Sequence, residues 1–176
     1  VNTNGRWTAM YGTGGLIDLT TTQAVADEQE KYILLAISQM WEALLFSTAA
    51  DLWGAIPYSQ AANPEYAQPE FDSQQDVHMA VLDLIDDAIE NFQEGQTFAL
   101  PVEYDFTFNA DIDRWVAAAR TLKSRIYLNW AEVNSDYYQL ALQESEMGIL
   151  DESGSGDWTA LHGASIAERS VWFQFI

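Results

Sequence analysis

Apolar side chains recur at helical spacing along most of the chain, and this pattern predicts its main elements. From Gln23 to about Ala50 the apolar positions cover more than one stripe, which is typical of a helix that is buried on two sides. A second helix is predicted after Asp72, whose side chain is placed to cap the helix, with Gln75 three residues later in the capping-box position. Its apolar positions are Val77, Val81, Leu84, Ile85, Ala88 and Phe92.

Two further helices are predicted in the second half of the chain. The third begins behind residues 109–111, and its apolar face is formed by Trp115, Ala119, Leu122, Ile126 and Trp130. Asn134 or Ser135 then caps a fourth helix, which is expected to end at Gly148. Short turns between helices of this length predict antiparallel helical hairpins, the unit of tetratricopeptide-like arrays, although the tetratricopeptide consensus itself is absent. The predicted fold class is therefore all-α: tetratricopeptide-like antiparallel hairpins, forming an α-α superhelix, with irregular loops.

Glycine and proline mark the predicted boundaries. The first helix is expected to end at Gly54 in a left-handed C-cap, and Pro57 prevents an early restart. The segment 94–110 is predicted to be a loop. We therefore divide the chain into an irregular region at 1–22, whose glycines suit a loop or a short helix, a helical-hairpin core at 23–150, and an irregular segment at 151–176.

The composition narrows the possible partners. The chain has 176 residues of which 48% are hydrophobic, enough for a packed core, and no uninterrupted apolar run long enough to span a membrane. Its net charge of -20 disfavours nucleic acid, because phosphate binding depends on Lys and Arg. Basic residues gather on the third predicted helix and acidic ones on the second, which predicts solvated faces with a few weak interhelical ion pairs rather than a ligand groove. These are Arg114, Arg120, Lys123 and Arg125, against Asp76, Asp83, Asp86, Asp87 and Glu90.

Each familiar catalytic template lacks the residues it needs. There is no cysteine, and the two histidines, His78 and His162, form no HExxH motif, so we expect both to be structural or exposed. No GxSxG motif is present, and the glycines at 12–15 lack the Lys-Ser/Thr of a phosphate loop. The 27 acidic residues offer many carboxylate pairs for a glycosidase but single out none. We therefore predict no enzyme, no cofactor and no metal.

The most specific stretch connects the first two predicted helices. Residues 51–61 read Asp-Leu-Trp-Gly-Ala-Ile-Pro-Tyr-Ser-Gln-Ala, and residues 69–77 read Pro-Glu-Phe-Asp-Ser-Gln-Gln-Asp-Val. We interpret the stretch as a structural corner, because glycine lets a helix stop, proline fixes φ, and aromatic rings can cover the hairpin end. The residues that define it are Asp51, Trp53, Gly54, Pro57, Tyr58, Asp72 and Gln74.

This corner closely resembles the SusD/RagB family of outer-membrane lipoproteins, whose members show D-x-[WF]-G-D-I-P-Y-x-x-A, a short spacer and P-x-[YF]-D-[ST]-Q. Residues 113–128 look like the family's K-W-x-x-x-A-N-[ST]-L-x-x-R segment, and the glycine before Ile149 matches its helix-ending G-x-[LI]. Order and spacing agree over roughly residues 20–150. Ala55 stands where the family usually has Asp, and Arg120 where it has Asn, so the hydrogen bonding of the turn is expected to differ.

The resemblance implies a non-catalytic lipoprotein, exposed at the surface of the cell outer membrane, that captures oligosaccharides for import through a SusC-like TonB-dependent transporter. It also implies that an N-terminal lipid anchor and much of the C-terminal half lie outside this chain, which we read as a piece of a longer protein. Two alternatives stay open: a peptide-capturing, RagB-like member, and a helical-repeat module that binds only proteins.

The resemblance also suggests where ligand contacts lie. The region before the first predicted helix is similar to the one where the family places aromatic glycan contacts, and its glycines permit exposure. Aromatic rings there would stack on pyranose faces while polar side chains bond the hydroxyls. The predicted ligand-binding residues are Asn4, Arg6, Trp7 and Tyr11, with Trp158 and Trp172 as further candidates.

Overall fold

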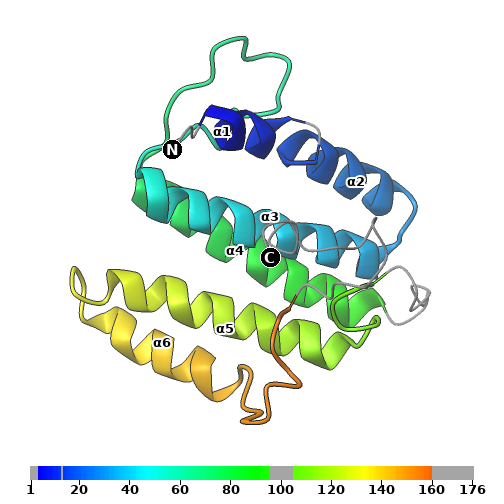
Figure 1. Ribbon diagram of the computed structural model, residues 1–176, viewed down its shortest axis with the longest axis vertical. Coiled ribbons are helices and arrows are strands. Elements are labelled where there is room, and N and C mark those ends of the chain that lie inside the picture. The colour runs from blue at the N-terminus through cyan, green and yellow to red at the C-terminus, as the bar shows by residue number, and fades with distance from the viewer. Residues whose placement is uncertain (1–3, 13, 96–104, 160–176) are drawn as a thin grey trace, which may run out of the picture.

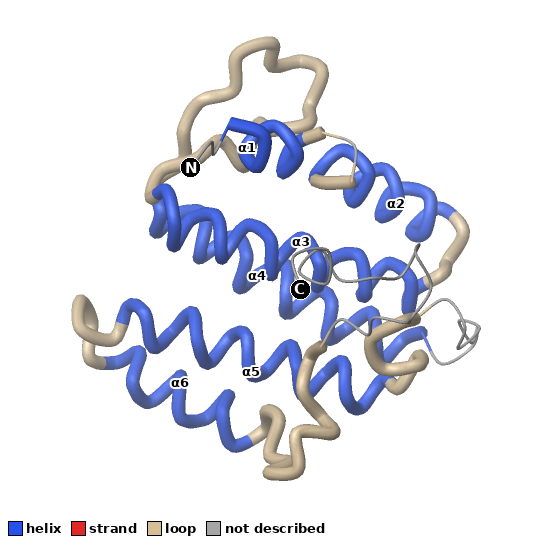
Figure 2. The backbone as a smooth tube through the Cα atoms, in the orientation of Figure 1, coloured by secondary structure: helices blue, strands red, loops and turns tan. Residues whose placement is uncertain are grey.

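A computed structural model describes residues 4–12, 14–95 and 105–159, which form six α-helices and no strand. The helices are α1 (Asn4–Tyr11), α2 (Leu16–Glu28), α3 (Tyr32–Trp53), α4 (Gln74–Glu94), α5 (Ile112–Trp130) and α6 (Asp136–Glu146). They lie in three layers, with α1 and α2 on one side, α3 and α4 in the middle, and α5 and α6 on the other side (Figure 1). Helices and loops account for all of this part of the chain (Figure 2), so the predicted all-α class of stacked hairpins is confirmed.

The central helix is α3. It packs against α4, α2 and α5, which agrees with the prediction that the first long helix is buried on more than one side. By length and composition α3 is apolar enough to cross a membrane, but 72% of its most apolar stretch is buried inside the fold. Such burial is what the core helix of a helical bundle shows, because its neighbours cover it on several sides.

The prediction of one helix over 23–50 is wrong. The helix α2 ends at Glu28, and α3 begins at Tyr32. Between them Glu30 adopts a φ of 54°, and the Lys31 N–H donates to the Ala26 carbonyl at 2.8 Å, which closes the end of α2. A non-glycine residue rarely takes this conformation, so the sequence carries no sign of the break.

In the region at 1–22, where a loop or a short helix is expected, α1 is a short helix, and the first part of α2 adds a second helix that is not expected. Gly15 is buried at the junction of these helices, where a Cβ would lie only 2.1 Å from the Met10 carbonyl oxygen. Gly14 adopts a φ of 83° beside it. These glycines therefore serve a tight turn between two helices rather than a loop.

The remaining helices agree with the predictions, with small changes at their ends. Ser73, not Asp72, caps α4, since its Oγ accepts from the Asp76 N–H at 3.1 Å. Asp111 caps α5 by accepting from the Arg114 N–H at 3.2 Å. At α6 the side chain of Asn134 accepts from the N–H of Asp136 at 3.1 Å, while Ser135 makes no side-chain cap, and the helix ends just short of Gly148. The predicted loop at 94–110 is confirmed for residues 105–110, and residues 96–104 lie outside the described chain.

The predicted interhelical ion pairs are present, but their centre is buried rather than solvated. Lys123 of α5 is almost fully buried and pairs with Asp86 of α4 and with Glu144 of α6, the latter at 3.3 Å. Arg120 binds the same Glu144 at 2.9 Å. Burial alone would lower the pKa of Lys123, but these carboxylates raise it. The pairs therefore connect α4, α5 and α6 through one buried lysine.

Candidate ligand-binding site

Asp72 organises the corner between α3 and α4. Its Oδ2 accepts from the backbone N–H groups of Tyr58 and Ser59, both at 2.8 Å, and its Oδ1 accepts from the Ser59 hydroxyl at 2.7 Å. Its backbone forms an antiparallel bridge with Ile56. Although burial alone would raise it, the hydrogen bonds from Ser59 and Tyr58 lower the pKa of Asp72. An ionised carboxylate therefore folds the loop back on itself.

Tyr58 connects this corner to the buried face of α3. Its hydroxyl donates to Glu42 Oε1 at 2.9 Å, and Gln23 of α2 donates to Glu42 Oε2 at 2.7 Å. Glu42 is only 6% exposed, and burial raises its pKa against the effect of these two donors. Next to it the Tyr11 hydroxyl donates to the Pro57 carbonyl at 2.7 Å, so α1 is joined to the corner as well.

At the end of α3, Asp51 joins α4 and α5. It accepts from Asn129 at 3.2 Å and lies 3.3 Å from Nε2 of the fully buried His78. The indole N–H of Trp130 donates to His78 Nδ1 at 2.8 Å, so the imidazole proton sits on Nε2 and faces Asp51 and the Ser47 carbonyl. His78 is thus structural, and His162 lies outside the described residues. Within that described part, no cluster of three or more metal-binding side chains is found.

Two other motif residues mark the geometry of the corner. Gly54 has a φ of 75°, positive as expected, but its ψ of -117° is outside the left-handed helical region. Gln74 is the first residue of α4. Trp53 packs edge-on against Trp7 of α1, with ring centroids 5.4 Å apart. The motif residues therefore fix the loop that follows α3 and the position of α1 against it.

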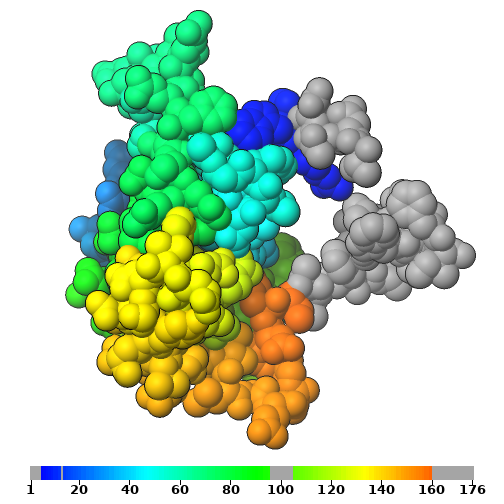
Figure 3. Space-filling view, turned by 90° about the vertical axis from the view of Figure 1, so that its left-hand side faces the viewer, coloured from blue at the N-terminus to red at the C-terminus, as the bar shows by residue number. Residues whose placement is uncertain are grey.

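This arrangement creates an aromatic cavity between α1 and the loop. Trp7 contacts Tyr11 at 5.4 Å and stacks on Phe71 at 6.4 Å between ring centroids. The loop stands out from the body of the helices beside α1 (Figures 1 and 3). The cavity measures about 520 Å³ and is lined by Trp7, Tyr11, Ile17, Pro57, Ala61, Ala62, Asn63, Pro64, Tyr66 and Pro69. None of these side chains is charged.

Of the predicted ligand residues whose side chains the structure describes, Trp7 and Tyr11 line this cavity. Arg6 instead lines a separate groove of about 470 Å³ between α1 and α3. The side chain of Asn4 lies outside the described residues, as does Trp172. Trp158 lies away from α1, packed against Trp41 and Trp115 at 5.2 Å each.

Sequence reasoning missed Tyr66, which is 45% exposed on the rim of the cavity. It belongs to the spacer between the two parts of the motif, where no periodicity singles it out. An available signal was its position between Pro64 and Pro69, because prolines stiffen a loop and favour an exposed ring.

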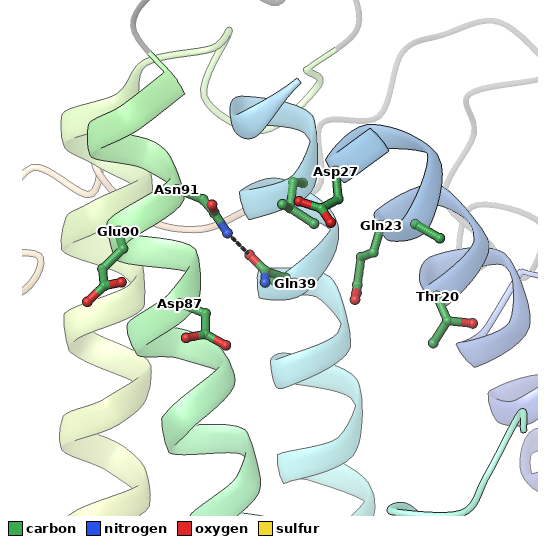
Figure 4. Close-up of a pocket in the computed structure, with 9 residues that line it drawn as sticks. Thr20, Gln23, Asp27, Gln39, Asp87, Glu90 and Asn91 are labelled. Carbon is green, nitrogen blue, oxygen red and sulfur yellow. Dashed lines mark hydrogen bonds between the residues drawn. The ribbon is translucent and has the colours of Figure 1, made fainter. Parts of the chain in front are cut away.

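A second cavity of about 500 Å³ lies between α2, α3 and α4 (Figure 4). Asn91 donates to Gln39 at 2.9 Å across it. Its other polar walls include three carboxylates, Asp27, Asp87 and Glu90, and no aromatic ring lines it. It therefore lacks the stacking surface that the first cavity offers.

Known proteins resemble this chain in sequence and in fold. The family model for SusD-like proteins, described as "Starch-binding associating with outer membrane", matches residues 1–174. A SusD/RagB family protein from Bacteroides thetaiotaomicron superposes with a TM-score of 0.76 at 23% identity, over 86% of this chain and 32% of that one. A SusD-like protein from the same organism gives 0.70 at 26% identity, over 86% and 31%.

A chitin-binding protein gives a TM-score of 0.70 at 21% identity, over 84% of this chain and 32% of that one. The chain thus spans about a third of the length of these structures. No curated protein matches it.

Proposed function

Because the chain belongs to the SusD-like family, we propose that it is part of a non-catalytic protein that captures oligosaccharides at the surface of the outer membrane. The proposed partner is a SusC-like TonB-dependent transporter, which would import the captured sugar, and the proposed attachment is an N-terminal lipid anchor. The observation that carries this proposal is the uncharged aromatic cavity between α1 and the loop after α3.

The walls of the cavity suit a neutral sugar. The apolar faces of pyranose rings stack on aromatic side chains, and Trp7 and Tyr66 offer such faces from two separate elements. Asn63 adds an amide on the same wall, where it can bond sugar hydroxyls. We assign Trp7 and Tyr66 as stacking residues and Tyr11 as part of the wall, whose hydroxyl already donates to Pro57. Among the predicted contacts, the geometry favours Trp7 and Tyr11 over Arg6.

Two substitutions test this assignment. Trp7→Ala and Tyr66→Ala should each weaken oligosaccharide binding at least ~10-fold, which corresponds to about 1.4 kcal/mol. Binding is measured first by retention on affinity gels that contain starch, chitin, plant or algal polysaccharides, and then by titration calorimetry with the matching oligosaccharide. Tyr138→Ala is the matched control, because Tyr138 is a tyrosine of nearly equal exposure on α6, far from the cavity.

Unchanged affinity in both cavity variants would refute the site. Retention of peptides without any polysaccharide would replace sugar capture by peptide capture. Release of reducing ends that stops when one carboxylate is removed would show an enzyme instead.

A further inference from the structure

The indole of Trp7 is contacted by aromatic rings from two elements outside α1. The ring of Trp53, at the end of α3, lies nearly perpendicular to the indole, at 87° and 5.4 Å between centroids. The ring of Phe71, at the end of the loop, lies nearly parallel to it, at 19° and 6.4 Å. Because these rings are held by other elements, they limit the orientations that the indole can take relative to the loop.

Phe71 is 64% exposed, so burial explains little of the presence of a phenylalanine at this position. The described lining of the aromatic cavity includes Trp7 but not Phe71. A ring that stacks on Trp7 from outside the cavity leaves free the part of the indole that faces the cavity. The contact with Trp7 is therefore the main role that the structure offers for the Phe71 ring.

Hydrogen bonds fix the backbone on both sides of Phe71. The Glu70 N–H donates to Gln60 Oε1 at 3.0 Å, and the Asp72 N–H donates to the Ile56 carbonyl at 2.9 Å. Neighbouring side chains of an extended segment point to opposite sides. The Asp72 carboxylate accordingly lies against the loop, whereas the Phe71 ring lies against α1.

We propose that Phe71 is a positioning residue, whose ring holds the Trp7 indole in the orientation in which it stacks on the captured sugar. This role rests on the proposed function, because it concerns a stacking residue of the same cavity. Trp7 is half-buried on a helix of eight residues. Fixing one of its rotamers before the ligand arrives lowers the entropy cost of binding. The corner thus serves ligand binding as well as the fold, since Asp72 fixes the loop and Phe71 fixes the indole.

Three variants isolate the contribution of the ring. Phe71→Leu removes the ring and keeps an apolar side chain, whereas Phe71→Tyr keeps the ring and is the conservative variant. The matched control is Phe106→Leu, because Phe106 is a phenylalanine of similar exposure (74%) in the loop before α5. That loop lies far from α1 (Figure 1). The urea unfolding midpoint should stay unchanged in all three variants, since both positions are exposed.

The first measurement needs no sugar. The NMR order parameter of the Trp7 indole N–H, whose signal is identified by its loss in Trp7→Ala, should fall from about 0.85 toward about 0.6 in Phe71→Leu. It should be retained in Phe71→Tyr and in Phe106→Leu. An unchanged order parameter in Phe71→Leu would overturn the proposal, even if that variant binds sugar less well.

The second measurement is the affinity, by calorimetry, for the oligosaccharide that the unmodified chain binds. Phe71→Leu should weaken binding roughly 3- to 10-fold, because the freed indole must be ordered on binding, and Phe71→Tyr should restore it. In a chain that already carries Trp7→Ala, Phe71→Leu should cause no further loss, because no indole remains to be positioned. A further loss there would show that Phe71 contacts the sugar itself, which contradicts a positioning role, as would an unchanged affinity of Phe71→Leu alone.

Together the two measurements separate this inference from the proposed function. If Phe71→Leu frees the indole but the unmodified chain binds no sugar, the proposed function fails and the role of Phe71 in binding fails with it. If sugar binding depends on Trp7 while the indole stays ordered without the Phe71 ring, the proposed function stands and the positioning role alone is overturned.

Discussion

The same hydrogen bond, a tyrosine hydroxyl that donates to a glutamate, occurs in two regions that connect helices. In the corner between α3 and α4, Tyr58 donates to Glu42, which is 6% exposed. At the junction of α5 and α6, Tyr138 of α6 donates to Glu132 of the turn, and both side chains face water. The chemistry is shared, so the contrast isolates the effect of the surroundings.

Burial is the main cause of the pKa shifts in the first region. It raises the pKa of Glu42, and burial followed by the charge of Glu42 raises the pKa of Tyr58. In the second region the pKa of Tyr138 is also raised, but the first cause is its hydrogen bond to Glu132. The pKa of both tyrosines is thus raised, but for different causes. Breaking the hydrogen bond is expected to change the free energy of unfolding only for the buried pair.

The largest effect is expected from removing the buried hydroxyl. Tyr58→Phe leaves Glu42 with Gln23 as its remaining donor, and a buried carboxylate that loses one hydrogen bond destabilises the fold by about 1–3 kcal/mol. Urea unfolding of the variant at neutral pH measures this loss. Tyr138→Phe is the matched control and should leave the unfolding midpoint unchanged, because water replaces its hydroxyl. Equal destabilisation by both variants would break the comparison.

A smaller effect, and one that depends on pH, is expected from Glu42→Gln, because the amide keeps at least one of the two hydrogen bonds. Burial raises the folded pKa of Glu42 above its ordinary value of 4.5. The folded state therefore binds the Glu42 proton more tightly than the unfolded state does. The stabilisation that this gives is full below pH 4.5 and is lost as the pH rises through the folded pKa. The variant should gain stability relative to the unmodified chain as urea unfolding is repeated from pH 4.5 to about pH 7.5. Parallel curves for the variant and the unmodified chain would contradict a buried Glu42 whose pKa is raised.

The sequence predicted the regions where local signals and packing agree. The helices α4 and α5 have apolar residues at the helical period and a capping side chain within one residue of the expected place. Prediction from the sequence failed where tertiary contacts decide the backbone conformation. The break at Glu30 needs a left-handed non-glycine residue, and Gly15 serves the contact between two helices rather than a loop. Neither role is visible in a pattern of apolar positions.

The candidate site shows the same limit. Arg6 and Trp7 are neighbours in sequence, so a loop would let both reach one ligand. Once α1 forms, successive side chains point about 100° apart, and the two residues face different grooves. Tyr66 joins Trp7 only because Asp72 folds the loop back on α1, a long-range contact that sequence spacing does not encode.

The smallest effect concerns the exposed pair and appears in titration rather than in stability. Glu132→Gln should lower the pKa of Tyr138 toward its ordinary value of 10.0, because an amide oxygen accepts a weaker hydrogen bond from the phenol than a carboxylate does and carries no charge. Titration of the tyrosine ring carbons by NMR follows this residue separately from Tyr58, whose pKa should not change. Added salt should shrink the part of the Tyr138 shift that comes from the charge of Glu132, which is exposed and screened, but should leave Tyr58 nearly unaffected, since burial is the first cause there. If salt and the substitution leave Tyr138 unmoved, its hydrogen bond to Glu132 does not form in solution, and the buried pair stands alone.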